Sequence, residues 1–171
     1  GSGVDAPITA LMVFDNKLIV GGNLNAAGGV AANKIASWDG SSWSALGSGI
    51  DGLGLSSLAV FNTKLIAGGN IIAAGGVGVT NIASWDGSVW SSLGSGLNNS
   101  VRALTIYSNE LIAGGSFTTA GGASANRLAA WDGSGWAPLG AGTDGPVLTP
   151  TDFANKQIAA GVFGTAGGVI A

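Results

Sequence analysis

Residues 38–43 read Trp-Asp-Gly-Ser-Ser-Trp, and closely similar hexapeptides occupy residues 85–90 and 131–136. In each copy an Asp-Gly pair separates two short, largely apolar runs, a pattern that is the strongest short-range signal for a β-hairpin. The three copies therefore predict an array of repeated β units. The residues of this repeat signature are Trp38, Asp39, Gly40 and Trp43, then Trp85, Asp86, Gly87 and Trp90, then Trp131, Asp132, Gly133 and Trp136.

The spacing of the array is nearly constant along the chain. The aromatic residues Phe14, Phe61, Tyr107 and Phe153 follow one another at intervals of 47, 46 and 46 residues. Each copy reads as four short strands, which in the first copy are 8–14, 18–20, 35–38 and 43–46. A period of about 45 to 50 residues built from four strands is typical of a β-propeller blade. The sequence therefore predicts an all-β fold of four-stranded antiparallel meanders, and a Gly-rich β-solenoid is the alternative.

The repeat also resembles a known family. It is similar to the kelch-type repeats of the galactose oxidase central-domain superfamily, in the bacterial variety that carries Ala-Gly-Gly, Asn-Arg-Ile/Leu-Ala-x-Trp-Asp-Gly and Trp-x-x-Leu-Gly. Residues 126–133 match this pattern most fully and residues 33–40 nearly so, whereas the second copy has Thr80-Asn81 in place of Asn and a basic residue. A WD40 repeat is less favoured, because its Trp-Asp is paired with an upstream Gly-His and this chain has no histidine. The resemblance implies a kelch-like propeller in an extracellular or cell-surface protein.

We expect one repeat domain over residues 1–171, with repeats at 1–46, 47–93, 94–139 and 140–171, the last one truncated. The chain holds four copies of the first hairpin and three of the second, so the expected propeller is incomplete, at about three and a half blades. Two interpretations follow. In the first, the chain is part of a longer array of repeats. In the second, its open sheet edges are completed by further copies of the same chain.

Composition excludes several function classes. Charged residues make up only 9% of the chain, the formal net charge is −3, and there is no basic run, so nucleic acid is not an expected partner. The absence of histidine and cysteine excludes Ser-His-Asp and Cys-His catalysis, thiolate metal sites and the copper chemistry of galactose oxidase. No apolar run is long enough for a membrane span, and no signal peptide is visible. We therefore expect no cofactor and no enzymatic activity.

The repeated aspartates and tryptophans are candidates for binding a metal ion or a sugar, but each also has an ordinary structural role. Asp39, Asp86 and Asp132 recur like a ring of calcium ligands, but the first residue of an Asp-Gly turn ordinarily caps backbone N–H groups, and one carboxylate per repeat lacks the oxygen ligands that Ca²⁺ needs. The six tryptophans could stack on sugars, but aromatic residues at one repeated strand position more often pack between sheets. Better contact candidates are the variable connections at 23–25, 70–72 and 116–119. No catalytic or metal-binding residue is predicted, and binding residues stay unknown.

These observations favour a non-enzymatic binding or adhesion scaffold that recognises a protein or glycan on a surface. One alternative is a structural subunit that assembles with further copies of the same chain into an oligomer or filament. A second alternative is a carbohydrate-binding lectin.

Overall fold

A computed structural model of the chain describes residues 3–153, 156–167 and 169–170. All regular structure in these residues is β-strand, which confirms the all-β class. None of the described residues belongs to a helix that is long and apolar enough to cross a membrane.

Three antiparallel sheets are each built on four strands that are hydrogen-bonded in chain order, and the second sheet includes one further short strand. The first sheet is built from β1 (Ile8–Phe14), β2 (Lys17–Gly22), β5 (Ile35–Trp38) and β6 (Trp43–Ala45). The second is built from β7 (Ile50–Phe61), β8 (Lys64–Ala74), β10 (Ile82–Trp85) and β11 (Trp90–Ser92), and the third from β12 (Val101–Tyr107), β13 (Glu110–Gly115), β16 (Leu128–Trp131) and β17 (Trp136–Pro138). The antiparallel four-stranded meander is thus confirmed three times.

The fourth sheet consists of β18 (Val147–Phe153) and β19 (Lys156–Gly161) alone. Each repeat also contains a short hairpin that the sequence did not reveal, inside the Gly- and Ala-rich connection. These additional strands are β3 (Ala26–Ala27) and β4 (Val30–Ala31), β9 (Val77–Gly78), which pairs with the end of β8, β14 (Thr119–Ala120) and β15 (Ala123–Ser124), and β20 (Thr165–Ala166) and β21 (Val169–Ile170). They are only two residues long, too short to show the alternation by which strands are recognised.

Two-residue turns set the register of the inner hairpins. Phe14 pairs with Lys17, and the intervening Asp15 and Asn16 have φ angles of 49° and 57°. Positive φ at both central residues matches the right-handed twist of the strands, and short polar side chains tolerate it. The same geometry recurs in the second and third repeats.

The one interval of 47 residues has a local cause in the second repeat. Ile8 follows Val4 by four positions, whereas Leu55 follows the equivalent Ile50 by five. The extra residue is absorbed by irregular pairing within β7, which starts at Ile50. The exposed Leu53 lies in this enlarged segment.

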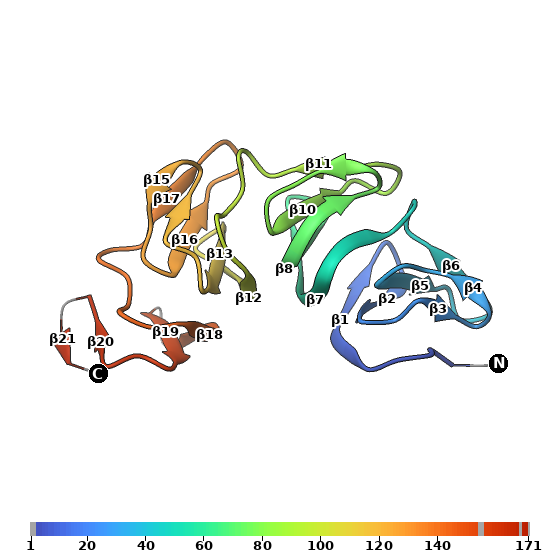
Figure 1. Ribbon diagram of the computed structural model, residues 1–171, viewed down its shortest axis with the longest axis horizontal. Helices are drawn as coiled ribbons and strands as arrows, with labels where there is room; N and C mark the ends of the chain where they lie inside the picture. Colours follow the sequence, from blue (N-terminus) through green and yellow to red (C-terminus); the bar gives the residue numbers. More distant parts are fainter. Residues whose placement is uncertain (1–2, 154–155, 168, 171) are drawn as a thin grey trace.

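The four sheets stand side by side and form an open arc (Figure 1), with β1, β7, β12 and β18 in contact as successive inner strands. Hydrophobic clusters fill the space between neighbouring sheets. A glycine at the end of the second strand permits this close approach. A Cβ on Gly21 would lie 2.5 Å from Leu55 of the next sheet, and Gly68 and Gly114 meet Val101 and Val147 in the same way.

Candidate functional site

The two tryptophans of each repeat signature face each other across the outer hairpin. The ring centroids of Trp38 and Trp43 are 5.2 Å apart at an interplanar angle of 48°, and the other two pairs are nearly identical at 5.3 and 5.4 Å. Tilted aromatic pairs of this kind contribute about 0.5–1.5 kcal/mol beyond their area burial. The pairs therefore stabilise the hairpins that carry them.

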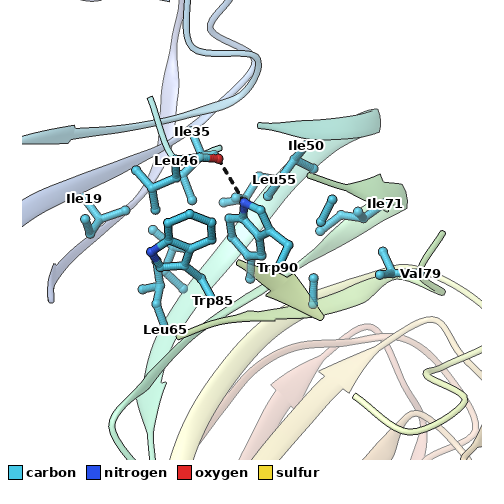
Figure 2. Close-up of a cluster of buried hydrophobic side chains, with 14 residues drawn as sticks. Ile19, Ile35, Leu46, Ile50, Leu55, Leu65, Ile71, Val79, Trp85 and Trp90 are labelled. Atoms are coloured by element: carbon cyan, nitrogen blue, oxygen red, sulfur yellow. Dashed lines mark hydrogen bonds between the residues drawn. The ribbon is translucent and has the colours of Figure 1, made fainter. Parts of the chain in front are cut away.

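In the second and third repeats the tryptophans also pack against the preceding sheet. Trp85 and Trp90 are 8% and 4% exposed and lie among Ile19, Ile35 and Leu46 of the first sheet (Figure 2). The Trp90 indole N–H donates to the Leu46 carbonyl at 2.9 Å, and Trp136 donates to the Leu93 carbonyl at 3.0 Å. Trp85 and Trp90 are thus occupied by packing and offer no free face on which a sugar could stack.

The repeated aspartates are used inside their own turns. The Asp39 Oδ1 atom accepts hydrogen bonds from the backbone N–H groups of Ser41 and Ser42, both at 2.8 Å. These bonds lower the pKa of Asp39, and the bond from Ser42 has the largest effect. The equivalent bonds lower the pKa of Asp86 and Asp132. Among the described residues no group of three acidic side chains lies close enough together to hold a metal ion. The aspartates therefore act as turn caps.

The variable connections that were expected to contact a ligand are only partly exposed to solvent. Their central residues Leu24, Ile71 and Phe117 are buried, at 0%, 1% and 0% exposure, and anchor each connection in the hydrophobic interior. In the first copy, the sequence signal for a buried central residue is an apolar residue between two polar ones, Asn23-Leu24-Asn25. The residues on either side of these anchors, such as Asn23 and Thr118, remain accessible to a ligand.

Two crevices between neighbouring sheets are repeats of one another. One is lined by Phe14, Ile19 and Trp85 and the other by their equivalents Phe61, Ile66 and Trp131. Since the same positions line both, these crevices are a product of sheet packing and carry no individual chemistry.

A groove of about 290 Å³ is different, because three repeats supply different residues to it. Thr9 and Asn23 come from the first repeat, Asn70 and the enlarged segment around Leu53 from the second, and Arg102 from the third. Its further lining residues are Gly54, Leu55, Ser56 and Ser100. We call this the inner-strand groove. None of it was predicted from the sequence except Asn23 and Asn70, which lie in the variable connections.

Hydrogen bonds hold several of these side chains in place. The Thr9 hydroxyl donates to the Leu55 carbonyl at 2.6 Å and so joins the first two sheets. The Arg102 Nε–H donates to the Ser116 hydroxyl at 3.3 Å. Arg102 is exposed, as is Asn23, and the guanidinium is the only charged group in the groove lining. A fixed guanidinium beside amides and hydroxyls can bind a ligand that carries both carboxylate and hydroxyl groups.

The chain matches no protein-family model, and no curated protein matches it significantly. The chemistry of the inner-strand groove is therefore the basis on which a function can be proposed.

Proposed function

We propose that this chain is a non-enzymatic binding or adhesion scaffold, built as an incomplete, kelch-like β-propeller. Three four-stranded meanders with strands in chain order, and inner strands in contact from sheet to sheet, support the propeller architecture. The sequence resemblance to surface propellers supports an extracellular or cell-surface location.

The observation that carries the binding role is a contrast between constant and variable positions. At the position that follows Ile8 and its equivalents in the later repeats, the four repeats have Thr9, Ser56, Arg102 and Leu148. Three of these four residues line the inner-strand groove, whereas the packing positions around it repeat from sheet to sheet. A variable surface on a constant frame is the usual construction of a binding face.

The proposed ligand class is an acidic glycan. The guanidinium of Arg102 matches the geometry of a sugar carboxylate, and the amides of Asn23 and Asn70 match hydroxyl groups. This assignment includes the lectin alternative, but places the sugar on polar side chains instead of the tryptophans.

The test is binding to an array of neutral and acidic glycans. We expect preferential binding of acidic glycans by the wild type. Arg102→Ala removes a charged hydrogen-bonding partner, a change of about 1.5–3 kcal/mol that weakens binding about tenfold or more. Asn70→Ala weakens it to a smaller extent.

Lys17→Ala is the matched control, because it also removes one positive charge from an exposed position but lies outside the groove. Binding that Arg102→Ala and Lys17→Ala reduce equally would contradict the assignment to the groove. Cleavage of a bound glycan would contradict the non-enzymatic role.

A further inference from the structure

We infer that the acidic sugar bound in the inner-strand groove is an N-acetylated one, which carries an acetamido group as well as its carboxylate. This inference rests on the binding role proposed above and narrows the ligand class. It starts from Leu53, whose aliphatic side chain lines the groove and is 81% exposed. The polar side chains of Asn23, Asn70 and Arg102 line the same groove.

Leu53 is the extra residue of the second repeat. Gly52 pairs with Ile71 and Gly54 pairs with Asn70, so Leu53 between them has no partner on β8. Because its side chain is so exposed, it adds little to the packing between the sheets, all three of which are present around the groove. Leu53 therefore gives an otherwise polar groove an exposed apolar surface.

Two side-chain amides in the groove are available to a ligand. Within the described residues, neither the amide of Asn23 nor that of Asn70 makes a hydrogen bond. By contrast, the amides of Asn33, Asn81 and Asn126 each donate to a carbonyl of the segment that follows. A primary amide is both a donor and an acceptor, so it can pair with the N–H or the C=O of another amide.

Gly54 brings the amide of Asn23 next to the extra residue. A Cβ on Gly54 would lie 2.7 Å from Asn23 Oδ1, so the Asn23 side chain occupies the space over the residue that follows Leu53. The first and third repeats have Pro7 and Ser100 at the position of Gly54. The apolar surface of Leu53 and an unpaired amide are thus neighbours.

Together these groups match an acidic sugar with an acetamido substituent. The acetamido N–H and C=O pair with the asparagine amides, and the methyl group contacts Leu53. The Arg102 Nε–H is engaged by the Ser116 hydroxyl, which leaves the two Nη groups for the carboxylate. A uronic acid has no methyl group for Leu53, and a neutral N-acetyl sugar has no carboxylate for Arg102. The inferred ligand therefore belongs to the sialic acid class.

The test uses two trisaccharide probes that differ in one group. One is sialyllactose with N-acetylneuraminic acid, and the other is its analogue with a hydroxyl in place of the acetamido group. Both probes carry the carboxylate, so Arg102→Ala should weaken the binding of both. The wild type should bind the acetamido probe about tenfold more tightly or better, since the methyl contact and an amide hydrogen bond are lost in the analogue.

Leu53→Ser should lower this preference about fourfold, which corresponds to the loss of one methyl contact. Ile72→Ser is the matched control. Ile72 is another aliphatic residue of the same hairpin, is 66% exposed and also lacks a ladder partner, but it does not line the groove. The control should keep the wild-type preference, and circular dichroism of both variants should match that of the wild type. An equal loss in both variants would overturn the role of Leu53.

Gly54→Ala tests the placement of Asn23. Gly54 has no positive φ, so alanine is tolerated, and its Cβ displaces the end of the Asn23 side chain. Gly54→Ala and Asn23→Ala should each lower the preference about two- to tenfold through the lost hydrogen bond. The double variant should lower it no further than Asn23→Ala alone. Additive losses would overturn the place of Asn23 in the site.

The probes also separate this inference from the binding role on which it rests. Equal wild-type binding of both probes, weakened for both by Arg102→Ala, would leave the acidic-glycan role intact and overturn the acetamido inference. Binding of neither probe would overturn the inference as well, and the array of acidic glycans then decides separately whether the binding role stands. Binding that does not depend on Arg102 would overturn both.

Discussion

Trp136 and Trp43 occupy the same position in two repeats and are both half-buried, but only Trp136 has a described hydrogen-bond acceptor, the Leu93 carbonyl. Trp136→Phe removes this hydrogen bond, and the Leu93 carbonyl keeps the one from the Gly96 backbone N–H at 3.1 Å. We expect the free energy of unfolding to fall by about 0.5–1.5 kcal/mol in addition to the loss of ring area. Trp43→Phe is the control, because it removes the same atoms and no hydrogen bond within the described part of the chain. Urea denaturation of both variants measures the difference, and equal losses would show that the indole hydrogen bond does not stabilise the fold.

Acidity affects stability in the outer hairpins, and also at Asp5 and Asp144, whose pKa values are lowered by backbone hydrogen bonds from Ala26 and Thr165. Backbone N–H groups hold the pKa values of Asp39, Asp86 and Asp132 below that of an unfolded aspartate. Their contribution is therefore complete above the unfolded pKa, near pH 4, and is lost as the pH falls through the lower folded values. We expect the melting temperature to decrease below about pH 4. The triple Asp→Asn variant keeps the acceptor oxygens without the ionisation, so its melting temperature should change less between pH 6 and 2. If the melting temperature of this variant fell with decreasing pH as much as that of the wild type, the role of these carboxylates would be contradicted.

At the scale of the whole molecule, neighbouring sheets are joined by close backbone approach. A Cβ on Gly68 would lie 2.7 Å from Val101 Cγ1 and 3.2 Å from Leu104 Cδ1 of the next sheet. Gly68→Ala should therefore destabilise the fold by about 1–3 kcal/mol through overpacking. Hydrogen exchange should accelerate in β8 and β12, since repeat arrays lose stability at the affected interface. Gly78→Ala is the control, because no heavy atom lies within 4 Å of its Cβ position. A similar loss of stability in both variants would contradict the role of the close approach between β8 and β12.

Much of the fold was determined by the sequence alone. Turn residues and strand alternation are local signals, so the residues 35–46 were sufficient to predict a hairpin and the constant spacing was sufficient to predict repeated four-stranded sheets. The bounds of β1 and β5 agree with those expected. The short hairpins such as β3–β4 were missed, because two-residue strands have no detectable period.

Only the tertiary structure decided which of the repeated positions are exposed and which residues share a groove. Leu18 and Leu65 are equivalent in sequence, yet one is 38% exposed and the other 0%. Burial here depends on whether another sheet stands in front of the residue, and no local pattern contains that information. The groove likewise unites Thr9, Asn70 and Arg102, which are far apart in the chain and meet because the inner strands lie side by side.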